Sequence, residues 1–339
     1  MMDALAGEAI HIIGDFLPQH LGNTAWALAR LLNVNEPLLD AIAAESIKML
    51  EHCEQQEISN IFWAFAKLGV RHEPLMNAIA SSSIAHIHFN AQGLSNLAWS
   101  CAVLLFRPEP LLDALSAQSL PIISQFTEQN LANTAWAFAK IHKMTAPLWH
   151  AISSAALQRM SQFFSQAIAN MAWALATCLI QDDKLRDALS AQAINIMPEF
   201  GPQNLSNTAW ASTTMVSFSD LAVEEARSAC LSRMTSFPVQ ELVNTAWAIA
   251  RLIFSHKTLI TAIAQEASNK LHQYRARDLA NTIWGLTRLK EVGSLALQPL
   301  SGMAFVRVTH CLPQELSNLA WSLAVLQICD EPLLHAIAE

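Results

Sequence analysis

Apolar and polar residues follow one pattern along the chain, and this pattern returns every 37 residues. The stretch LANTAWAFAK at residues 131–140 has eight close copies. Each copy has an apolar residue, an asparagine two positions later and a tryptophan three positions after the asparagine. Successive asparagines are 37 residues apart, except for one interval of 36. A period of this length indicates an array of stacked helical repeats. The repeat asparagines are Asn23, Asn60, Asn96, Asn133, Asn170, Asn207, Asn244, Asn281 and Asn318.

Each repeat is expected to fold into two helices. The first helix extends from about four residues before the asparagine to about nine after it, because apolar residues there recur at helical spacing. An aromatic residue precedes this helix in six repeats, at Phe89, Phe126, Phe163, Phe200, Phe237 and Tyr274. The second helix begins near a proline, which loses no hydrogen bond in the first turn of a helix. These prolines are Pro37, Pro74, Pro110, Pro147 and Pro332.

Three features depart from the regular pattern. The 36-residue interval indicates a deletion late in a second helix or in the following loop, around residues 86–89. Pro121 and Pro299 fall inside second helices, where a proline removes a hydrogen bond and clashes with the preceding turn, at about 3 kcal/mol. Residues 291–299 also lack the proline that begins most second helices. We therefore predict that the eighth repeat has the shortest or most distorted second helix.

A rotation of about 100° per residue divides the first helix into faces. The apolar residue two positions before the asparagine lies on the same face as the residues two, five and six positions after it, and these residues are expected to form the core. The tryptophan lies on the flank of this core stripe. Beside it, the position just before the asparagine is small in almost every repeat, which leaves room for close contact between helices. These small residues are Gly22, Ser59, Ser95, Ala132, Ala169, Ser206, Ala280 and Ser317.

We expect the repeat tryptophans to be buried at the junctions between repeats. A tryptophan buries about 150–250 Å², which corresponds to about 4–6 kcal/mol of stabilisation. Replacing one by alanine is therefore expected to cost about 3–5 kcal/mol. The alternative is that the indoles form a platform on which nucleobases stack.

The opposite side of the first helix carries a polar stripe, which consists of the position four before the asparagine, the asparagine itself and the position seven after it. The position seven after is basic in five repeats, at Arg30, Lys67, Lys140, Arg251 and Arg288. Stacking of the repeats would turn these positions into parallel rows on one surface. The position four before is glutamine in eight repeats and arginine in one, at Gln19, Gln56, Gln92, Gln129, Gln166, Gln203, Gln240, Arg277 and Gln314.

The repeated asparagine has two interpretations. It either forms a structural ladder by bonding backbone groups of a neighbouring repeat, or it makes the same contact with the backbone of a bound chain in every repeat. A residue that is identical in all repeats cannot encode a varying base sequence. We favour the ladder, because an unpaired buried amide would cost about 1–3 kcal/mol and would not recur nine times. The position three before the asparagine varies freely and should have a different role.

Composition argues for close packing between repeats and against several classes of protein. Hydrophobic residues make up 53% of the chain and charged residues 14%, so most of each repeat must be buried. The net charge of −8 is unusual for a nucleic-acid binder, which generally has at least one basic face. Six cysteines without a CxxC pair indicate a reducing compartment.

Membrane insertion and catalysis are both disfavoured by the sequence. The uncharged windows 89–106 and 163–181 align with helices that end in lysine or arginine elsewhere, so we interpret them as core helices. No signal peptide opens the chain. No glycine-rich phosphate loop, metalloprotease motif or nucleophile elbow is present, and His86 and His88 lack a third ligand at metal spacing. We therefore expect no enzyme activity, metal or cofactor.

We expect residues 1–339 to form a single all-α domain, a right-handed α-solenoid of nine repeats. Both ends of the chain fall inside the second-helix segment of a repeat, and neither has the polar capping repeat of a free-standing solenoid. This pattern favours a fragment of a longer array.

The glutamine-x-leucine-x-asparagine helix with its tryptophan, followed at 37 residues by a proline-leucine-leucine helix, resembles the heptatricopeptide repeat over nearly the whole chain. That repeat is a relative of the octotricopeptide and pentatricopeptide classes. The resemblance implies the right-handed α-solenoid and a role in organellar RNA metabolism, in a mitochondrion or a plastid. Such proteins often have a C-terminal RAP domain, which these residues do not include.

The resulting hypothesis is an RNA-binding solenoid that acts in organellar RNA processing, stabilisation or ribosome assembly. Single-stranded RNA would lie along a groove lined by the first helices. Further partners would be ribosomal or RNA-processing proteins, and no membrane contact is expected. The alternative is a scaffold for protein–protein interaction, which the acidic charge suits. Candidate RNA-binding residues are Gln56, Asn60, Lys67, Gln129, Asn133, Lys140, Gln240, Asn244, Arg251, Asn281 and Arg288.

Overall fold

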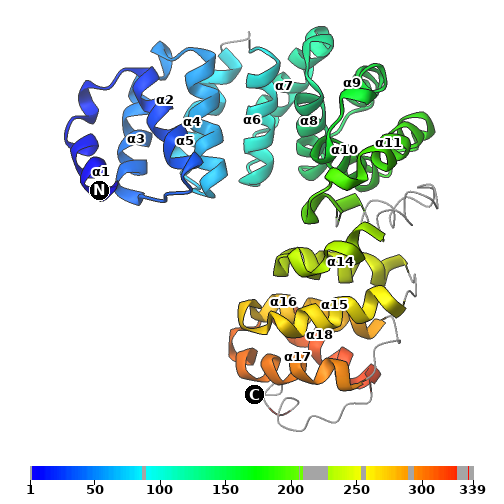
Figure 1. Cartoon of the computed structure of the whole chain (residues 1–339). Coiled ribbons are helices and arrows are strands. Elements are labelled where there is room, and N and C mark those ends of the chain that lie inside the picture. The colour runs from blue at the N-terminus through cyan, green and yellow to red at the C-terminus, as the bar shows by residue number, and fades with distance from the viewer. Residues whose placement is uncertain are drawn as a thin grey trace. The chain divides into compact units, whose positions relative to one another are not determined.

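The computed structural model describes residues 2–85, 89–205, 207–208, 228–252, 257–288, 294–326 and 335. Throughout these ranges the regular structure consists of helices, and no strand is present (Figure 1). Neighbouring helices pack on one another as antiparallel pairs stacked along an array, so the all-α solenoid is confirmed.

The first helices lie where the asparagine pattern predicts them. Each begins five residues before the repeat asparagine and ends seven or eight residues after it, so the predicted limits are correct to within two residues. These helices are α2 (Pro18–Arg30), α4 (Gln55–Leu68), α6 (Ala91–Val103), α8 (Glu128–Lys140), α10 (Ser165–Cys178), α14 (Val239–Leu252), α16 (Ala276–Arg288) and α18 (Pro313–Leu326).

The second helices alternate with the first helices, and a short 3₁₀ turn follows most of them. Pro37, Pro74, Pro110 and Pro147 lie in the first turn of their helices, as predicted, whereas Pro332 lies outside the described residues. The second helices are α1 (Met2–His11), α3 (Glu36–Met49), α5 (Glu73–Ala85), α7 (Glu109–Ile122), α9 (Ala146–Gln158), α11 (Asp183–Ile196), α15 (Lys257–Asn269) and α17 (Ser294–Arg307).

The second helix of the eighth repeat was predicted to be the shortest or most distorted, and it is not the shortest. Helix α17 has 14 residues, as many as α3, α7 and α11, although Pro299 lies inside it. It begins thirteen residues after Asn281, in register with the other repeats. Helix α17 packs against α15 and α16, and it continues past Pro299 to Arg307 although the proline removes one internal hydrogen bond. The deletion predicted around residues 86–89 falls on residues 86–88, outside the described part of the chain.

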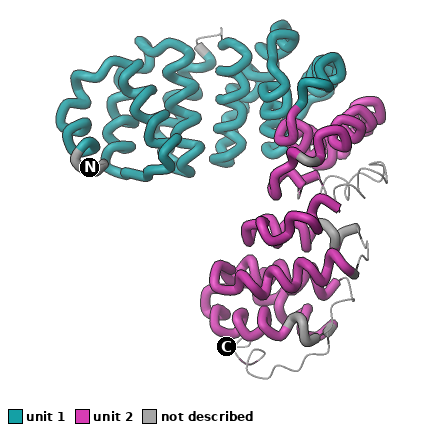
Figure 2. Tube along the Cα trace, viewed as in Figure 1, with its two compact units in different colours: residues 1–163 teal, residues 164–339 magenta. Residues whose placement is uncertain are grey.

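The chain divides into two compact units, residues 1–163 (unit 1) and residues 164–339 (unit 2), each shown in its own colour in Figure 2. In unit 1, helices α2, α4, α6 and α8 pack side by side in one layer, and α1, α3, α5, α7 and α9 form a second layer. In unit 2, α14, α16 and α18 form one layer and α15 and α17 the other. The core of each unit lies between its two layers.

The core stripe has the composition that the pattern predicts. Leu21, Ala25 and Ala29 of α2 are completely buried, and Leu242 and Ala246 hold the same positions in α14. The aromatic residues before the first helices are also buried, and those from Phe126 onward follow a 3₁₀ turn in an extended conformation that directs the ring into the core. These residues are Phe89, Phe126, Phe163, Phe200, Phe237 and Tyr274.

The two uncharged windows of the sequence fold as first helices α6 and α10 with their neighbouring turns. Most of their apolar residues are buried against adjacent helices. In the described part of the chain, no helix has both the length and the apolar character that are needed to cross a bilayer.

Candidate functional site

The polar stripe lies on the solvent side of the first helices. Its outer row, the position four before the asparagine, is exposed in every repeat, because it points away from the second-helix layer. The basic residues Arg30, Lys67 and Arg288 are exposed as well, and Lys140 is half-buried. The side chain of Arg251 lies outside the described residues.

The asparagines are not buried as the ladder interpretation requires. Asn23 is exposed, and the asparagines of the other eight repeats are partly exposed. The Gln240 amide nitrogen donates a hydrogen bond to the Asn244 side-chain oxygen over 3.1 Å, and Gln314 donates likewise to Asn318 over 3.2 Å. Both bonds lie within one helix and on the solvent side, so the ladder to a neighbouring repeat is contradicted at Asn244 and Asn318.

The described tryptophans of the repeat lie beside the junctions but are not fully buried there, so the prediction of buried indoles holds only in part. Trp26 and Trp321 keep 47% and 45% of their surface exposed. Partly exposed tryptophans occupy the same position in six further repeats, at Trp63, Trp99, Trp136, Trp173, Trp247 and Trp284, while Trp210 lies outside the described residues. We call the eight described side chains the indole row.

Close approach of the first helices explains why the indoles lie on the surface. A Cβ atom added to Gly22 of α2 would lie 3.6 Å from the Glu57 Cα of α4. One added to Gly285 of α16 would lie only 3.1 Å from the Ala246 carbonyl oxygen of α14. Small residues at these contacts leave no space for an indole between the backbones, so the indole lies across the outer edge of the contact.

Within each unit the indoles contact one another and the basic residues of the polar stripe. The ring centroids of Trp63 and Trp99 are 6.4 Å apart, and those of Trp284 and Trp321 are 6.3 Å apart. The Lys140 ammonium lies 4.6 Å from the Trp136 centroid, four residues earlier on the same helix, and burial lowers its pKa. Arg30 over Trp26 and Arg288 over Trp284 have the same geometry, at 5.6 and 5.5 Å.

The predicted residues therefore fall on one side of the first-helix layer in each unit. In unit 1 these residues are Gln56, Asn60 and Lys67 on α4 and Gln129, Asn133 and Lys140 on α8. In unit 2 they are Gln240 and Asn244 on α14 and Asn281 and Arg288 on α16. Each set combines amides, cations and indoles at a solvent-facing surface.

The variable position three before the asparagine has a local structural role. Its side chain accepts the backbone N–H at the start of the same helix, which would otherwise lack a partner. Asp278 accepts from the Arg275 N–H at 3.1 Å, and Glu315 accepts from the Leu312 N–H at 2.7 Å. His20 and Asn130 make the equivalent bonds to Leu17 and Thr127. In these four repeats, the residue at this position therefore caps the start of its own helix.

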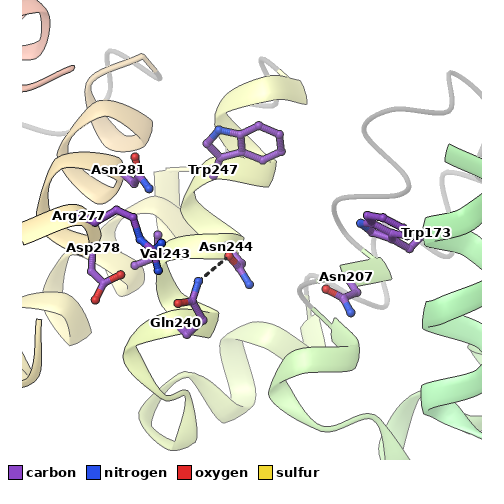
Figure 3. Close-up of a pocket in the computed structure, with 9 residues that line it drawn as sticks. All are labelled: Trp173, Asn207, Gln240, Val243, Asn244, Trp247, Arg277, Asp278 and Asn281. Carbon is purple, nitrogen blue, oxygen red and sulfur yellow. Dashed lines mark hydrogen bonds between the residues drawn. The ribbon is translucent and has the colours of Figure 1, made fainter. Parts of the chain in front are cut away.

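Unit 2 also contains a pocket of about 450 Å³ on the polar stripe (Figure 3). Helix α14 contributes Gln240, Asn244 and Trp247, and α16 contributes Arg277 and Asn281. Trp173 of α10 and Asn207 line the pocket from earlier repeats. The lining is mainly polar, with indole surface from two tryptophans.

A comparison with known protein families matches most of the chain. The family model described as RNA-editing substrate-binding complex 6 protein (RESC6) matches residues 7–234, about two thirds of the chain. The chain belongs to the RESC6 family. The match begins in α1 and ends just before α14, so it covers all of unit 1 except its first six residues, and it includes the indoles of that unit. No curated protein matches the chain.

In this RESC6-family chain, the sequence interpretation missed a second row of cations, near the ends of the second helices. Arg159 donates to the Phe126 carbonyl oxygen at 2.8 Å, and Lys270 donates to the Phe237 carbonyl oxygen at 2.7 Å. Arg233 and Arg307 bond Phe200 and Tyr274 in the same way. These residues recur 26 positions after the asparagine, a period that the sequence shows. These cations donate hydrogen bonds to backbone carbonyls in the turns between helices. The cations that lie beside indoles belong to the polar stripe.

Among the residues that the structure describes, no cluster of histidine, cysteine and carboxylate side chains could hold a metal ion. The described cysteines are free, and burial raises the pKa of the Cys53 thiol to about 11 and that of Cys101 to about 12. Such thiols are poor nucleophiles and poor metal ligands at neutral pH.

Proposed function

We propose that this protein binds single-stranded RNA along the solvent side of its first helices. The observation that carries the proposal is the indole row, in which partly exposed tryptophans repeat once per first helix beside amides and cations. Stacking of a base on an aromatic side chain contributes about 1–3 kcal/mol and tolerates any base. The amides would then bond base edges, and Lys67, Lys140 and their equivalents would contact phosphates.

Single strands fit this surface better than duplexes do. In a duplex, the bases stack on one another and cannot reach the indoles, whereas unpaired bases can turn outward onto them. The family name, which places its namesake in an RNA-editing substrate-binding complex, supports an RNA partner and neighbouring proteins.

The cellular role follows from the resemblance to the heptatricopeptide repeat. We expect the protein to act in a mitochondrion or plastid, in RNA processing, RNA stabilisation or ribosome assembly. Immunodetection of the chain in purified organelles tests the location, and its recovery only outside these organelles would contradict it.

A binding titration with a labelled RNA strand of mixed sequence tests the central proposal. Trp63→Ala combined with Trp99→Ala should weaken binding at least about tenfold, because two stacking surfaces are lost. The matched control is Trp149→Phe in α9, because Trp149 is only 2% exposed and lies outside the indole row. The control should bind like the wild type, and the same strand in a duplex should bind more weakly. Unchanged binding by the double variant, with its helical content intact, would refute stacking.

A second role as a protein scaffold is favoured by exposed leucines after the first helices. Leu32, Leu105 and Leu179 have φ values of 52° and are well exposed, although an exposed residue with this conformation is usually glycine, as at Gly69. Apolar side chains retained at such positions suit contact with a protein partner. Lys67→Glu with Lys140→Glu should abolish RNA binding without affecting a partner held at the leucines.

A further inference from the structure

The pocket in unit 2 lies where two positions of the repeat pattern change. The position four before the asparagine is glutamine in eight repeats and Arg277 in the remaining one. The position just before the asparagine is small in eight repeats and Val243 in the ninth. Both exceptions line this pocket, from the neighbouring helices α16 and α14 (Figure 3). Because invariant positions cannot distinguish one base from another, changed positions that meet in one cavity indicate a specific contact.

We infer that this pocket holds one unpaired guanine of a bound RNA strand, and that Arg277 recognises it. This inference rests on the proposed RNA-binding function. The volume of about 450 Å³ lies in the range of about 300–1,000 Å³ that is usual for small-molecule sites. Trp173 and Trp247 provide aromatic surface, and the amides of Asn244 and Asn281 provide both donors and acceptors.

The chemistry of Arg277 selects guanine among the four bases. A guanidinium presents two parallel N–H donors, and guanine presents two acceptors, O6 and N7, on one edge. Adenine offers N7 next to an amino donor, which would oppose a guanidinium N–H. Cytosine presents an amino donor on the corresponding edge, and uracil a single carbonyl acceptor. Arg277 is exposed at the pocket, whereas Arg159, Arg233 and Arg307 are bonded to backbone carbonyls.

Asp278 makes a base a better occupant than a phosphate. Its side chain is buried and lines the same pocket, and one carboxylate oxygen is held by the Arg275 N–H at 3.1 Å. A phosphate in the pocket would lie near this fixed negative charge and be repelled. A guanine has no net charge and also has N–H donors on its pairing edge, which suit a nearby carboxylate or amide oxygen.

The test uses Arg277→Gln, which restores the residue that the other eight repeats have at this position. The probes are uridine-rich strands that contain a single guanosine, adenosine or 7-deazaguanosine, the last of which lacks the N7 acceptor. The wild type should bind the guanosine strand about tenfold more tightly than either other strand. Arg277→Gln should bind all three alike, with its affinity for the all-uridine strand unchanged.

The matched control is Lys67→Gln, which removes an exposed polar-stripe cation from unit 1. It should weaken binding to all strands by the same factor and leave the preference for guanosine intact. If Arg277→Gln instead weakens every strand equally, Arg277 contacts phosphate and the inference is wrong. Equal binding of guanosine and adenosine strands by the wild type would also overturn it. Failure of the wild type to bind any strand would overturn the proposed function itself.

Discussion

At the scale of single residues, exposure separates two kinds of tryptophan in this chain. Trp149 of α9 is almost completely buried, whereas Trp26 in the indole row is nearly half exposed. The two residues have the same side chain but remove different areas from water. Their contributions to stability should therefore differ, although the repeat pattern predicted a uniform cost for the indole row.

Trp149→Ala should lower the free energy of unfolding by about 3–5 kcal/mol, because it leaves a cavity in the core. Trp26→Ala should lower it by less than about 2 kcal/mol, because solvent already covers half of the indole. Urea unfolding followed by circular dichroism measures both changes. Equal losses for the two variants would show that the indole row supports the fold as much as the core does.

At the scale of elements, the cations near the ends of second helices join successive turns. The Lys270 ammonium donates to the carbonyl oxygens of Thr235 and Phe237, at 2.8 and 2.7 Å, and forms an ion pair with Glu266 at 2.9 Å. Hydrogen bonds to a charged group are stronger than neutral ones, and both side chains of this ion pair are largely buried. Such a cation connects segments that lie 33 and 35 residues apart in the sequence.

Lys270→Met should destabilise unit 2 by about 2–3 kcal/mol, because it leaves two carbonyl groups and a carboxylate without their partner. Lys48→Met provides the control, since Lys48 is exposed and its ion pair with Glu45 contributes less than about 1 kcal/mol. Thermal unfolding of both variants measures the difference. A loss for Lys270→Met no greater than that for Lys48→Met would mean that these bonds do not hold the repeats together.

At the scale of the whole molecule, the net charge of −8 and the placement of the cations set how RNA binding depends on salt. Several cations bond backbone carbonyls near the ends of second helices, which leaves few for phosphates. Base stacking does not release counterions. The affinity should therefore fall less steeply with salt concentration than that of a protein that binds mainly through phosphate contacts.

The logarithm of the RNA-binding constant should fall with the logarithm of salt concentration with a slope no steeper than about −2.8. Four described polar-stripe cations can contact phosphates, and each contributes about 0.7 to the slope for a single strand. These cations are Arg30, Lys67, Lys140 and Arg288. Titrations at several salt concentrations measure the slope, and a value near −8 would indicate a different, more basic binding surface.

The repeat pattern alone determined the helices, their limits and the core. Leu21 and Ala25 are buried and Gln19 is exposed as predicted, because helical periodicity assigns each position to a face without reference to any neighbour. The aromatic residues before the first helices were likewise recognisable, because their position in the period is constant and an isolated large ring beside a helix has no other place to pack.

Only the tertiary structure decided how exposed the side chains at the edge of each helix face are. The distance between first helices, set by residues such as Gly22 and Gly285, places the indoles at the outer edge of the junctions, and the periodicity of the sequence does not specify that distance. The carbonyl contacts of Lys270 depend on turns that bring separate segments together. The pocket beside Arg277 is formed where α14 and α16 pack together, so it depends on contacts between repeats. The helices themselves depend on the order of residues within each repeat.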